Sequence, residues 1–155
     1  MTEGTEDFKF SYLDPTKLTT DQVDDISGLL KQLTSKPKKV DRATLNEILS
    51  QSDVFILLVK NPEDRIVAMA TLAVRRLLLN KTGIIGDVVV DEQHRGMKLG
   101  KRMMEVLINK ARSEGALFIS LTSHPRREAA NHMYQSLKFE LIGNIGESNY
   151  YRLPL

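Results

Sequence analysis

Hydrophobic residues near the N-terminus recur at the spacing of amphipathic helices. Thr19 and Gln22 have the spacing of a capping box, and apolar residues follow at helical intervals up to Leu33. Asp41 is placed to cap a second helix whose apolar face extends to Leu49. We therefore expect two helices in this part of the chain, separated by a loop.

The next hydrophobic runs are typical of strands. Residues 54–59 and 66–74 are rich in aliphatic side chains, and the polar stretch 61–64 between them predicts the turn of a hairpin. A further run at 84–90 follows an expected loop at 80–83. Because this third run is almost entirely apolar, we expect it to be buried on both faces and central to a sheet.

From residue 91 the pattern alternates between helix and strand. A helix that begins near Leu99 is expected to end at Gly115, and residues 117–122 form the next strand. A strand, a helix and a second strand in this order predict a parallel crossover.

The last part of the chain predicts one more helix and two short strands, at 141–142 and 150–153. Ser123 is placed to cap this helix, whose expected buried side carries Ala129, Ala130, Met133 and Leu137. With no repeat or linker in view, we expect a single domain over residues 1–155. The order of elements predicts an α/β (α+β) fold with a mixed, mostly antiparallel sheet flanked by helices.

Composition narrows the possible functions. The chain has 155 residues, a net charge of +2 and no cysteine, so we expect neither nucleic acid nor membrane as a partner and no disulfide. Residues 1–20 lack the pattern of a secretion signal, and no window reaches the roughly 20 apolar residues of a membrane span. A cytoplasmic protein is the simplest interpretation. No group of His, Asp and Glu has metal-ligand spacing, so no metal is expected.

The segment 88–102 carries the clearest chemistry. A buried strand leads into a polar turn with Arg95 and Gly96, and a helix start with Gly100 follows. Free N–H groups at a helix start bind phosphate, and glycine lets a ligand approach the backbone closely. Lys98 and Lys101 add positive charge. The spacing excludes a P-loop, and the dinucleotide-binding glycine motif is absent.

This segment resembles the acetyl-CoA signature of the GNAT superfamily. Residues 95–100 read Arg-Gly-Met-Lys-Leu-Gly after the strand ending Asp-Val-Val-Val-Asp, and Lys98 stands where the family usually has its first signature glycine. A second motif runs from Asn131 through Tyr134 to Phe139, with Lys138 replacing another glycine. The resemblance implies a GNAT fold whose sheet is splayed between the strands at 84–90 and 117–122.

The resemblance implies acetyl-CoA as cosubstrate and names its contacts. In the family, pantetheine pairs with the central strand, here Val88, Val89 and Val90. The pyrophosphate then falls on the turn and helix start made by Arg95, Gly96, Met97, Lys98, Leu99, Gly100 and Lys101. Asn131 matches a position that contacts the cofactor.

The same resemblance implies catalytic roles. Tyr134 stands where relatives place the acid that protonates the departing thiolate, and a tyrosine is protonated at neutral pH. Many relatives have glutamate where this chain has Gly86, so the usual base is missing. Asp87, His124 or His132 could substitute directly or through water, and Asp87 is the candidate we name.

The acceptor amine is left open by the sequence. Residues 30–34, Leu-Lys-Gln-Leu-Thr, and the strand ending at 87–90 look like those of glucosamine-6-phosphate acetyltransferases, which favours a small amine such as an aminosugar phosphate. The segment 127–134 is similar to that of general bacterial members, for which a protein N-terminus or lysine is the alternative acceptor. The missing glutamate also leaves open a non-catalytic acyl-CoA-binding regulator. Relatives are often dimers, so a homodimer is expected.

Overall fold

A computed structural model describes residues 7–36 and 38–155. Residues 1–6 of the polar N-terminal stretch and residue 37 of the expected interhelical loop lie outside the described residues. The elements follow one another as β1 (Lys9–Tyr12), η1 (Pro15–Lys17), α1 (Thr20–Leu33), α2 (Arg42–Leu49), β2 (Val54–Lys60), β3 (Ile66–Arg76), β4 (Lys81–Val90), η2 (Glu92–His94), α3 (Leu99–Ser113), β5 (Phe118–Ser123), α4 (Glu128–Ser136), β6 (Glu140–Ile145) and β7 (Ser148–Pro154).

The strands form one mixed sheet. Their order is β1-β2-β3-β4-β5-β7-β6, with β4 and β5 parallel and β1–β2, β5–β7 and β6–β7 antiparallel. The parallel ladder is short and joins Gly83 to Ile119 and Ile84 to Ser120. The expected mixed and mostly antiparallel α/β fold is therefore confirmed.

The chain divides into two compact units that interleave in sequence. The first contains Met1–Thr71 and Asp87–Glu105, and the second contains Leu72–Gly86 and Val106–Leu155. The strands β3 and β4 and the helix α3 each contribute to both. The expected single domain stays a prediction.

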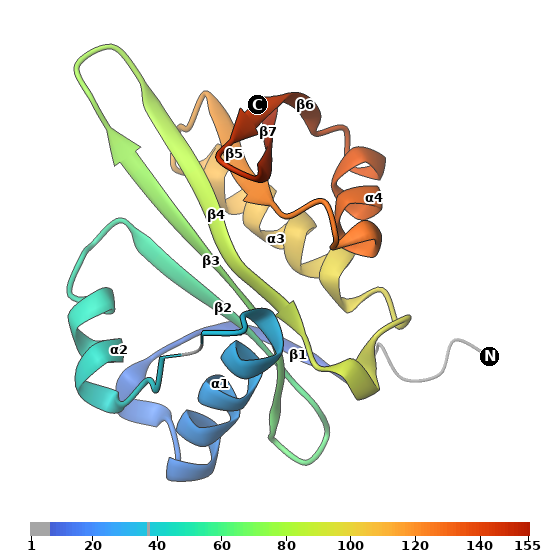
Figure 1. Cartoon of the computed structure of the whole chain (residues 1–155). Coiled ribbons are helices and arrows are strands. Elements are labelled where there is room, and N and C mark those ends of the chain that lie inside the picture. Colours follow the sequence, from blue (N-terminus) through green and yellow to red (C-terminus); the bar gives the residue numbers. More distant parts are fainter. Residues whose placement is uncertain (1–6, 37) are drawn as a thin grey trace. The chain divides into compact units, whose positions relative to one another are not determined.

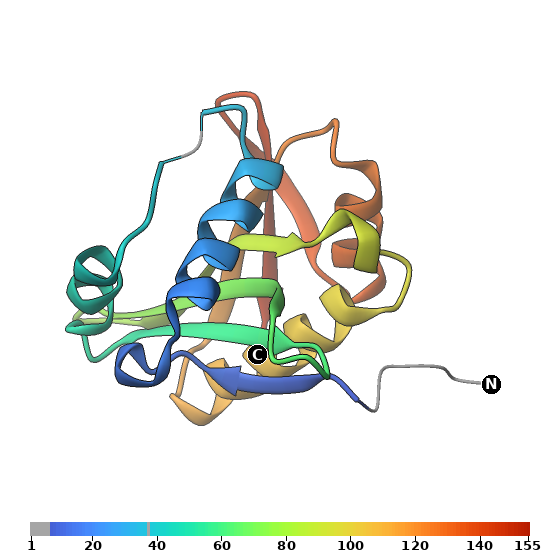
Figure 2. The same cartoon turned by 90° about the horizontal axis from the view of Figure 1, so that it is seen from below.

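In the first unit, the caps that the sequence predicts set the starts of α1 and α2. The Thr19 hydroxyl accepts from the backbone N–H of Gln22 at 3.1 Å, while the Gln22 side chain accepts from the N–H of Thr19 at 3.1 Å. The Asp41 carboxylate caps α2 by accepting from the N–H of Thr44 at 2.9 Å. Figures 1 and 2 show both helices beside the first strands, and their buried side chains join those of β2 and β3 in one apolar cluster: Val23, Ile26, Leu29, Leu45, Ile56, Leu58, Ile66 and Met69.

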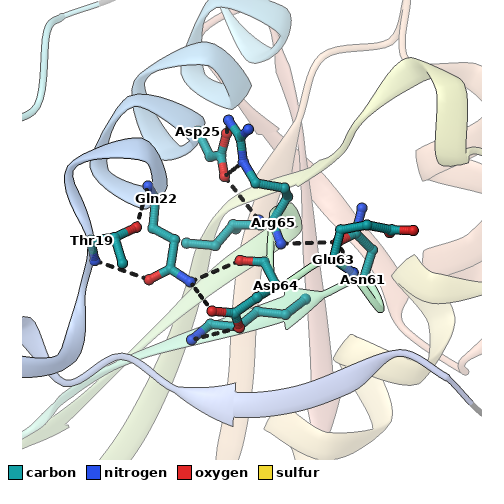
Figure 3. Close-up of polar contacts among 9 residues, drawn as sticks. Thr19, Gln22, Asp25, Asn61, Glu63, Asp64 and Arg65 are labelled. Carbon is teal, nitrogen blue, oxygen red and sulfur yellow. Dashed lines mark hydrogen bonds and ion pairs between the residues drawn. The ribbon is translucent and has the colours of Figure 1, made fainter.

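A polar network fastens α1 to the turn between β2 and β3 (Figure 3). The buried Gln22 amide donates to the backbone oxygen of Asp64 at 2.8 Å and to its carboxylate at 3.0 Å. Asp25 accepts from the Arg65 guanidinium at 2.5 and 2.9 Å, and also from the N–H of Ile66 at 3.0 Å. Since a buried amide without partners would be costly, this network fixes the hairpin against the start of α1.

In the second unit, α3 packs close to β4 at a glycine. A side chain at Gly83 would meet the Leu72 side chain at 3.2 Å, Ile119 at 3.4 Å and Ala111 of α3 at 3.7 Å. Residues 81–83 were expected in a loop, but they belong to β4, where glycine makes room for neighbouring side chains.

Three other expectations differ from the structure. Ser123 does not cap α4, because it lies in β5 and the helix starts five residues later, at Glu128. Its expected buried face is right only in part: Ala129 is exposed, Ala130, Met133 and Leu137 are half-buried, and Tyr134 is the buried residue. Ile84 is exposed, so β4 is not buried on both faces along its whole length. The strand β1 was missed, although its sequence Lys-Phe-Ser-Tyr alternates polar and aromatic residues as a strand does.

The helices α3 and α4 end in the same way. In both, the residue after the cap has a left-handed backbone, Gly115 with φ of 81° and Lys138 with φ of 74°. The N–H of Lys138 donates to the backbone oxygen of Gln135 at 3.0 Å, and the N–H of Phe139 donates to that of Tyr134 at 3.0 Å. These two bonds form a Schellman motif. Gly115 ends α3 as the sequence predicts, whereas Lys138 adopts a conformation that favours glycine.

We predict that Lys138→Gly stabilises the protein. Removing the side chain relieves the left-handed strain, and after the entropy cost of glycine we expect the free energy of unfolding to rise by about 0.5–1 kcal/mol. Urea denaturation measures this change. Gln135→Gly on the same helix is the matched control and should destabilise by about 1 kcal/mol. A loss of stability in Lys138→Gly would contradict the role assigned to its backbone.

Candidate active site

The turn between β4 and α3 has the backbone of an anion-binding site. Gly96 and Lys98 are both left-handed, with φ of 81° and 62°, and α3 begins directly afterwards at Leu99. Alternating backbone of this kind turns successive N–H groups toward one concave side, and the first N–H groups of a helix have no partner within it. The Arg95 side chain donates to the backbone oxygen of Val90 at 3.2 Å, which ties the turn to the strand end.

The C-terminal end of α1 holds the beginning of this turn. The Gln32 amide donates to the Asp91 carboxylate at 2.8 Å and accepts from the N–H of Glu92 at 2.9 Å. The second carboxylate oxygen of Asp91 lies 2.7 Å from His94 Nδ1. Partial burial favours a higher pKa for Asp91, but the hydrogen bonds from Gln32 and His94 outweigh it and lower the pKa of this carboxyl.

The strand before the turn, β4, has an irregular backbone at Asp87. Asp87 is left-handed with φ of 54°, and after it the regular alternation of β4 is lost because Val88 and Val89 are both buried. Its side chain is exposed and accepts from the Thr71 hydroxyl at 3.1 Å. Val90 is half-buried. The sequence did not reveal this irregularity, since aspartate rather than glycine occupies the left-handed position.

Tyr134 lies at the centre of an aromatic cluster in the second unit. Its ring is buried, with its centroid 5.9 Å from that of Tyr151 and 6.0 Å from that of Phe139. Burial raises the pKa of Tyr134, while the charge of Arg127 opposes this increase. The hydroxyl is therefore protonated at neutral pH, as an acid must be before it donates.

The Asn131 side chain links α4 to the loop before it and to the strand β7. Its side-chain amide donates to the backbone oxygens of His124 at 2.9 Å and Arg127 at 2.8 Å, and its oxygen accepts from the Tyr151 hydroxyl at 2.9 Å. These contacts hold the loop before α4 and the strand β7. A cofactor contact of Asn131 stays a prediction.

The expected site residues fall into two groups. The first unit brings together Asp87, the valines at 88–90 and the turn 95–101. The second unit holds Asn131 and Tyr134, together with the alternative bases His124 and His132. His132 is exposed, whereas His124 is half-buried and its Nδ1 accepts from the N–H of Arg126 at 3.1 Å.

Comparison with known proteins agrees with this geometry. The model of the Acetyltransferase (GNAT) family matches residues 23–139, which is more than half of the chain and includes both motifs. The chain belongs to the GNAT acetyltransferase family. It is accordingly an N-acetyltransferase. The two lysines at which the motif resemblance departs from the family, Lys98 and Lys138, both have a left-handed backbone.

Individual GNAT proteins are similar over most of the chain. Glucosamine 6-phosphate N-acetyltransferase 1 of Dictyostelium discoideum is 32% identical over 126 residues, covering 76% of this chain and 77% of that protein. The crystal structure of glucosamine-6-phosphate N-acetyltransferase from Arabidopsis thaliana is 25% identical with a TM-score of 0.75, covering 89% of this chain and 95% of that chain. A chain of the NatC complex bound to Gag peptide and CoA shares the fold, with 20% identity, a TM-score of 0.75, and coverage of 96% and 99%.

The sequence did not predict a polar cluster around Arg152 on β7. The Arg152 guanidinium on β7 lies 4.2 Å above the Phe118 ring and donates to the Tyr150 hydroxyl at 3.3 Å. This hydrogen bond is the main cause of a lowered pKa of Tyr150, and one with Ser120 contributes. The Arg152 Nε is buried without a partner in the described part of the chain. The pairing of β5 with β7 brings these residues together. In the sequence, the only signal for this cluster was that its residues alternate along the two strands, at 118 and 120 and at 150 and 152.

Among residues 7–36 and 38–155, no three His, Cys, Asp or Glu side chains are grouped so that they could hold a metal ion. Within the same ranges, no helix combines the length and apolar character that crossing a membrane requires.

We predict that Gln32→Leu weakens the attachment of the turn. The loss of two hydrogen bonds should lower the free energy of unfolding by about 1–2 kcal/mol at neutral pH. Because the pKa of Asp91 is lowered in the folded state, its contribution is present above the ordinary aspartate pKa of about 4 and is lost as the pH falls through the folded value. The difference in the free energy of unfolding between wild type and Gln32→Leu should therefore become smaller at acid pH.

Urea denaturation across a pH series measures this difference. The exposed Gln51 provides a control, and Gln51→Leu should show a small change that does not depend on pH. A difference for Gln32→Leu that stays constant down to acid pH would contradict the link to Asp91.

Proposed function

We propose that this GNAT protein transfers acetyl from acetyl-CoA to the primary amine of a small acceptor, an aminosugar phosphate. The observation that carries the proposal is the turn at 95–101, where left-handed Gly96 and Lys98 precede the start of α3. The named relatives from Dictyostelium and Arabidopsis, which are glucosamine-6-phosphate acetyltransferases, support the acceptor class.

In this proposal the cofactor contacts are those that the family motif implies. The pyrophosphate binds the N–H groups and side chains of the turn from Arg95 to Lys101, with Lys98 supplying an ammonium group where relatives have glycine. The backbone of Val88, Val89 and Val90 pairs with pantetheine, and Asn131 completes the contacts. The CoA in the NatC structure supports CoA as the carrier in a neighbour of this fold.

Tyr134 acts as the general acid in the proposed reaction. The acceptor amine attacks the thioester carbonyl, the carbon–sulfur bond breaks, and the departing thiolate takes the Tyr134 proton. The raised pKa of Tyr134 keeps it protonated at neutral pH. The attacking amine gives its proton to water or to Asp87, whose exposed carboxylate can reach solvent.

The cluster around Arg152 supports a phosphorylated acceptor. An arginine with a buried Nε that lacks a partner among the described residues is suited to bind an anion, because phosphate accepts several guanidinium hydrogen bonds. Tyr150 and Ser120 offer hydroxyl groups beside it. A peptide N-terminus or lysine as acceptor and a non-catalytic acyl-CoA-binding regulator are the alternatives.

We predict that acetyl-CoA turnover is fastest with glucosamine 6-phosphate. Thiol release is measured with this sugar, unphosphorylated glucosamine, lysine peptides and peptides with a free N-terminus. A preference for peptides would replace the proposed acceptor, and CoA binding without turnover on any amine would favour the regulator.

Arg152→Gln is expected to raise the KM for glucosamine 6-phosphate by about tenfold or more, because a hydrogen-bonded charge pair is lost. The KM for unphosphorylated glucosamine should stay unchanged. Arg112→Gln on the exposed side of α3 is the matched control. An equal effect on both sugars would exclude Arg152 from phosphate binding.

We also predict that Tyr134→Phe lowers kcat by about 10²–10⁴ while leaving acetyl-CoA affinity nearly unchanged. The ring and its aromatic contacts remain, so the melting temperature should change little. In wild type, the activity that depends on this proton should fall only when the pH exceeds the ordinary tyrosine pKa of about 10, because burial raises the pKa of Tyr134.

Tyr12→Phe in the first unit removes a hydroxyl elsewhere and serves as the control, with kcat expected within about threefold of wild type. Single-turnover measurements separate chemistry from product release. A normal single-turnover rate in Tyr134→Phe would remove this residue from the mechanism.

A further inference from the structure

The turn between β4 and α3 depends on the contacts at its two ends. Arg95, Gly96 and Lys98 in the middle of the turn are exposed, so packing around them does little to fix their position. At the end that joins α3, Leu99 is only 1% exposed, and its burial fixes the start of the helix in the core. The other end begins at Asp91, directly before the short helix η2.

Asp91 is held by polar contacts from three elements. The Gln32 amide at the end of α1 donates to one carboxylate oxygen of Asp91 at 2.8 Å, and its own oxygen accepts from the N–H of Glu92 at 2.9 Å. The other carboxylate oxygen lies 2.7 Å from Nδ1 of His94 in η2. The N–H of Asp91 donates to the backbone oxygen of Val67 in β3 at 2.8 Å. All of these residues belong to the first unit of the chain.

The contact requires the amide of a glutamine at position 32. One half of this amide donates to a carboxylate, and the other half accepts from a backbone N–H. A leucine would lose both hydrogen bonds. A glutamate would still accept from the N–H of Glu92, but it would place a second negative charge against the Asp91 carboxylate, and like charges at this distance repel. Because Gln32 is exposed, either substitution leaves the apolar core intact.

We propose that Gln32 and Asp91 are positioning residues for the pyrophosphate of CoA. They do not touch the cofactor themselves. They fix the start of the turn, so that its N–H groups already point in the required direction when the ligand arrives, and such groups bind charge best without rearrangement. The inference rests on the proposed function, in which the turn from Arg95 to Lys101 binds the pyrophosphate, and it adds two residues outside that turn that set the affinity.

Pantetheine distinguishes positioning from a general loss of structure, because it has the thiol arm of CoA without the pyrophosphate. Gln32→Leu should raise the dissociation constant of CoA by about fivefold or more and that of pantetheine by less than about twofold. Calorimetry measures the affinity for CoA, and an NMR titration measures that for pantetheine. Neither measurement needs an acceptor amine. Gln51→Leu makes the same change at another exposed position of the first unit and should leave both constants unchanged.

A reversed pair of side chains tests the contact between positions 32 and 91. Gln32→Glu should weaken CoA binding at least as much as Gln32→Leu. Adding Asp91→Asn restores one donor and one acceptor between the two side chains, and the CoA dissociation constant should return to within about twofold of wild type. The matched control adds Glu92→Gln to Gln32→Glu instead. It has the same net charge as the reversed pair but keeps the two carboxylates in contact, so CoA binding should stay weak.

Circular dichroism confirms that each variant is folded. Unchanged CoA affinity in Gln32→Leu, an equal loss of CoA and pantetheine, or equal recovery in both double variants would overturn the positioning role and leave the proposed function standing. Failure of the reversed pair to recover CoA affinity would have the same meaning. A wild type that binds CoA no more tightly than pantetheine would instead remove the pyrophosphate from the turn, and with it both the proposed cofactor contacts and this inference.

Discussion

Left-handed backbone at a small number of positions determines how the elements of this chain are joined. Among the described residues it occurs in the β2–β3 turn, within β4, before α3, after α3 and α4, and between β6 and β7: Asp64, Asp87, Gly96, Lys98, Gly115, Lys138 and Gly146. An L-residue in this region costs about 1–2 kcal/mol, so such a conformation persists only where surrounding contacts hold it. The hydrogen bonds around Asp64 and in the Schellman motif at Lys138 are contacts of this kind.

The fold was predictable where local chemistry determines it. The caps at Thr19 and Asp41 and the stop at Gly115 act through neighbouring residues, so their sequence patterns predicted the bounds of three helices closely. The failures at Ser123 and at residues 81–83 have another origin. There, pairing of β5 with β7 and packing of Gly83 beneath Ala111 override the local signal, and neither contact is visible in a short window of sequence.

In the candidate site too, features formed by neighbouring residues were predictable, and contacts between distant residues were not. The turn that we propose to bind phosphate is a continuous segment, and the sequence predicted its strand, turn and helix in order. Gln32 lies 59 positions before Asp91, and Phe118 lies far from Arg152 along the chain, so these contacts depend on the folded arrangement. The motif resemblance identified Lys98 and Lys138 as departures from the family, and the structure adds that both lysines adopt the left-handed backbone that favours glycine.

Polar side chains attach the helix α1 at both of its ends, and those at its C-terminal end hold the turn between β4 and α3. Near its start, Gln22 and Asp25 bind the β2–β3 hairpin, and near its end Gln32 binds Asp91 and Glu92. A displacement of the turn would therefore break hydrogen bonds to α1 as well as its own. Groups that bind a developing or fixed charge are most effective when they need no rearrangement. The attachment of α1 thus supplies rigidity that the glycine-containing turn cannot provide by itself.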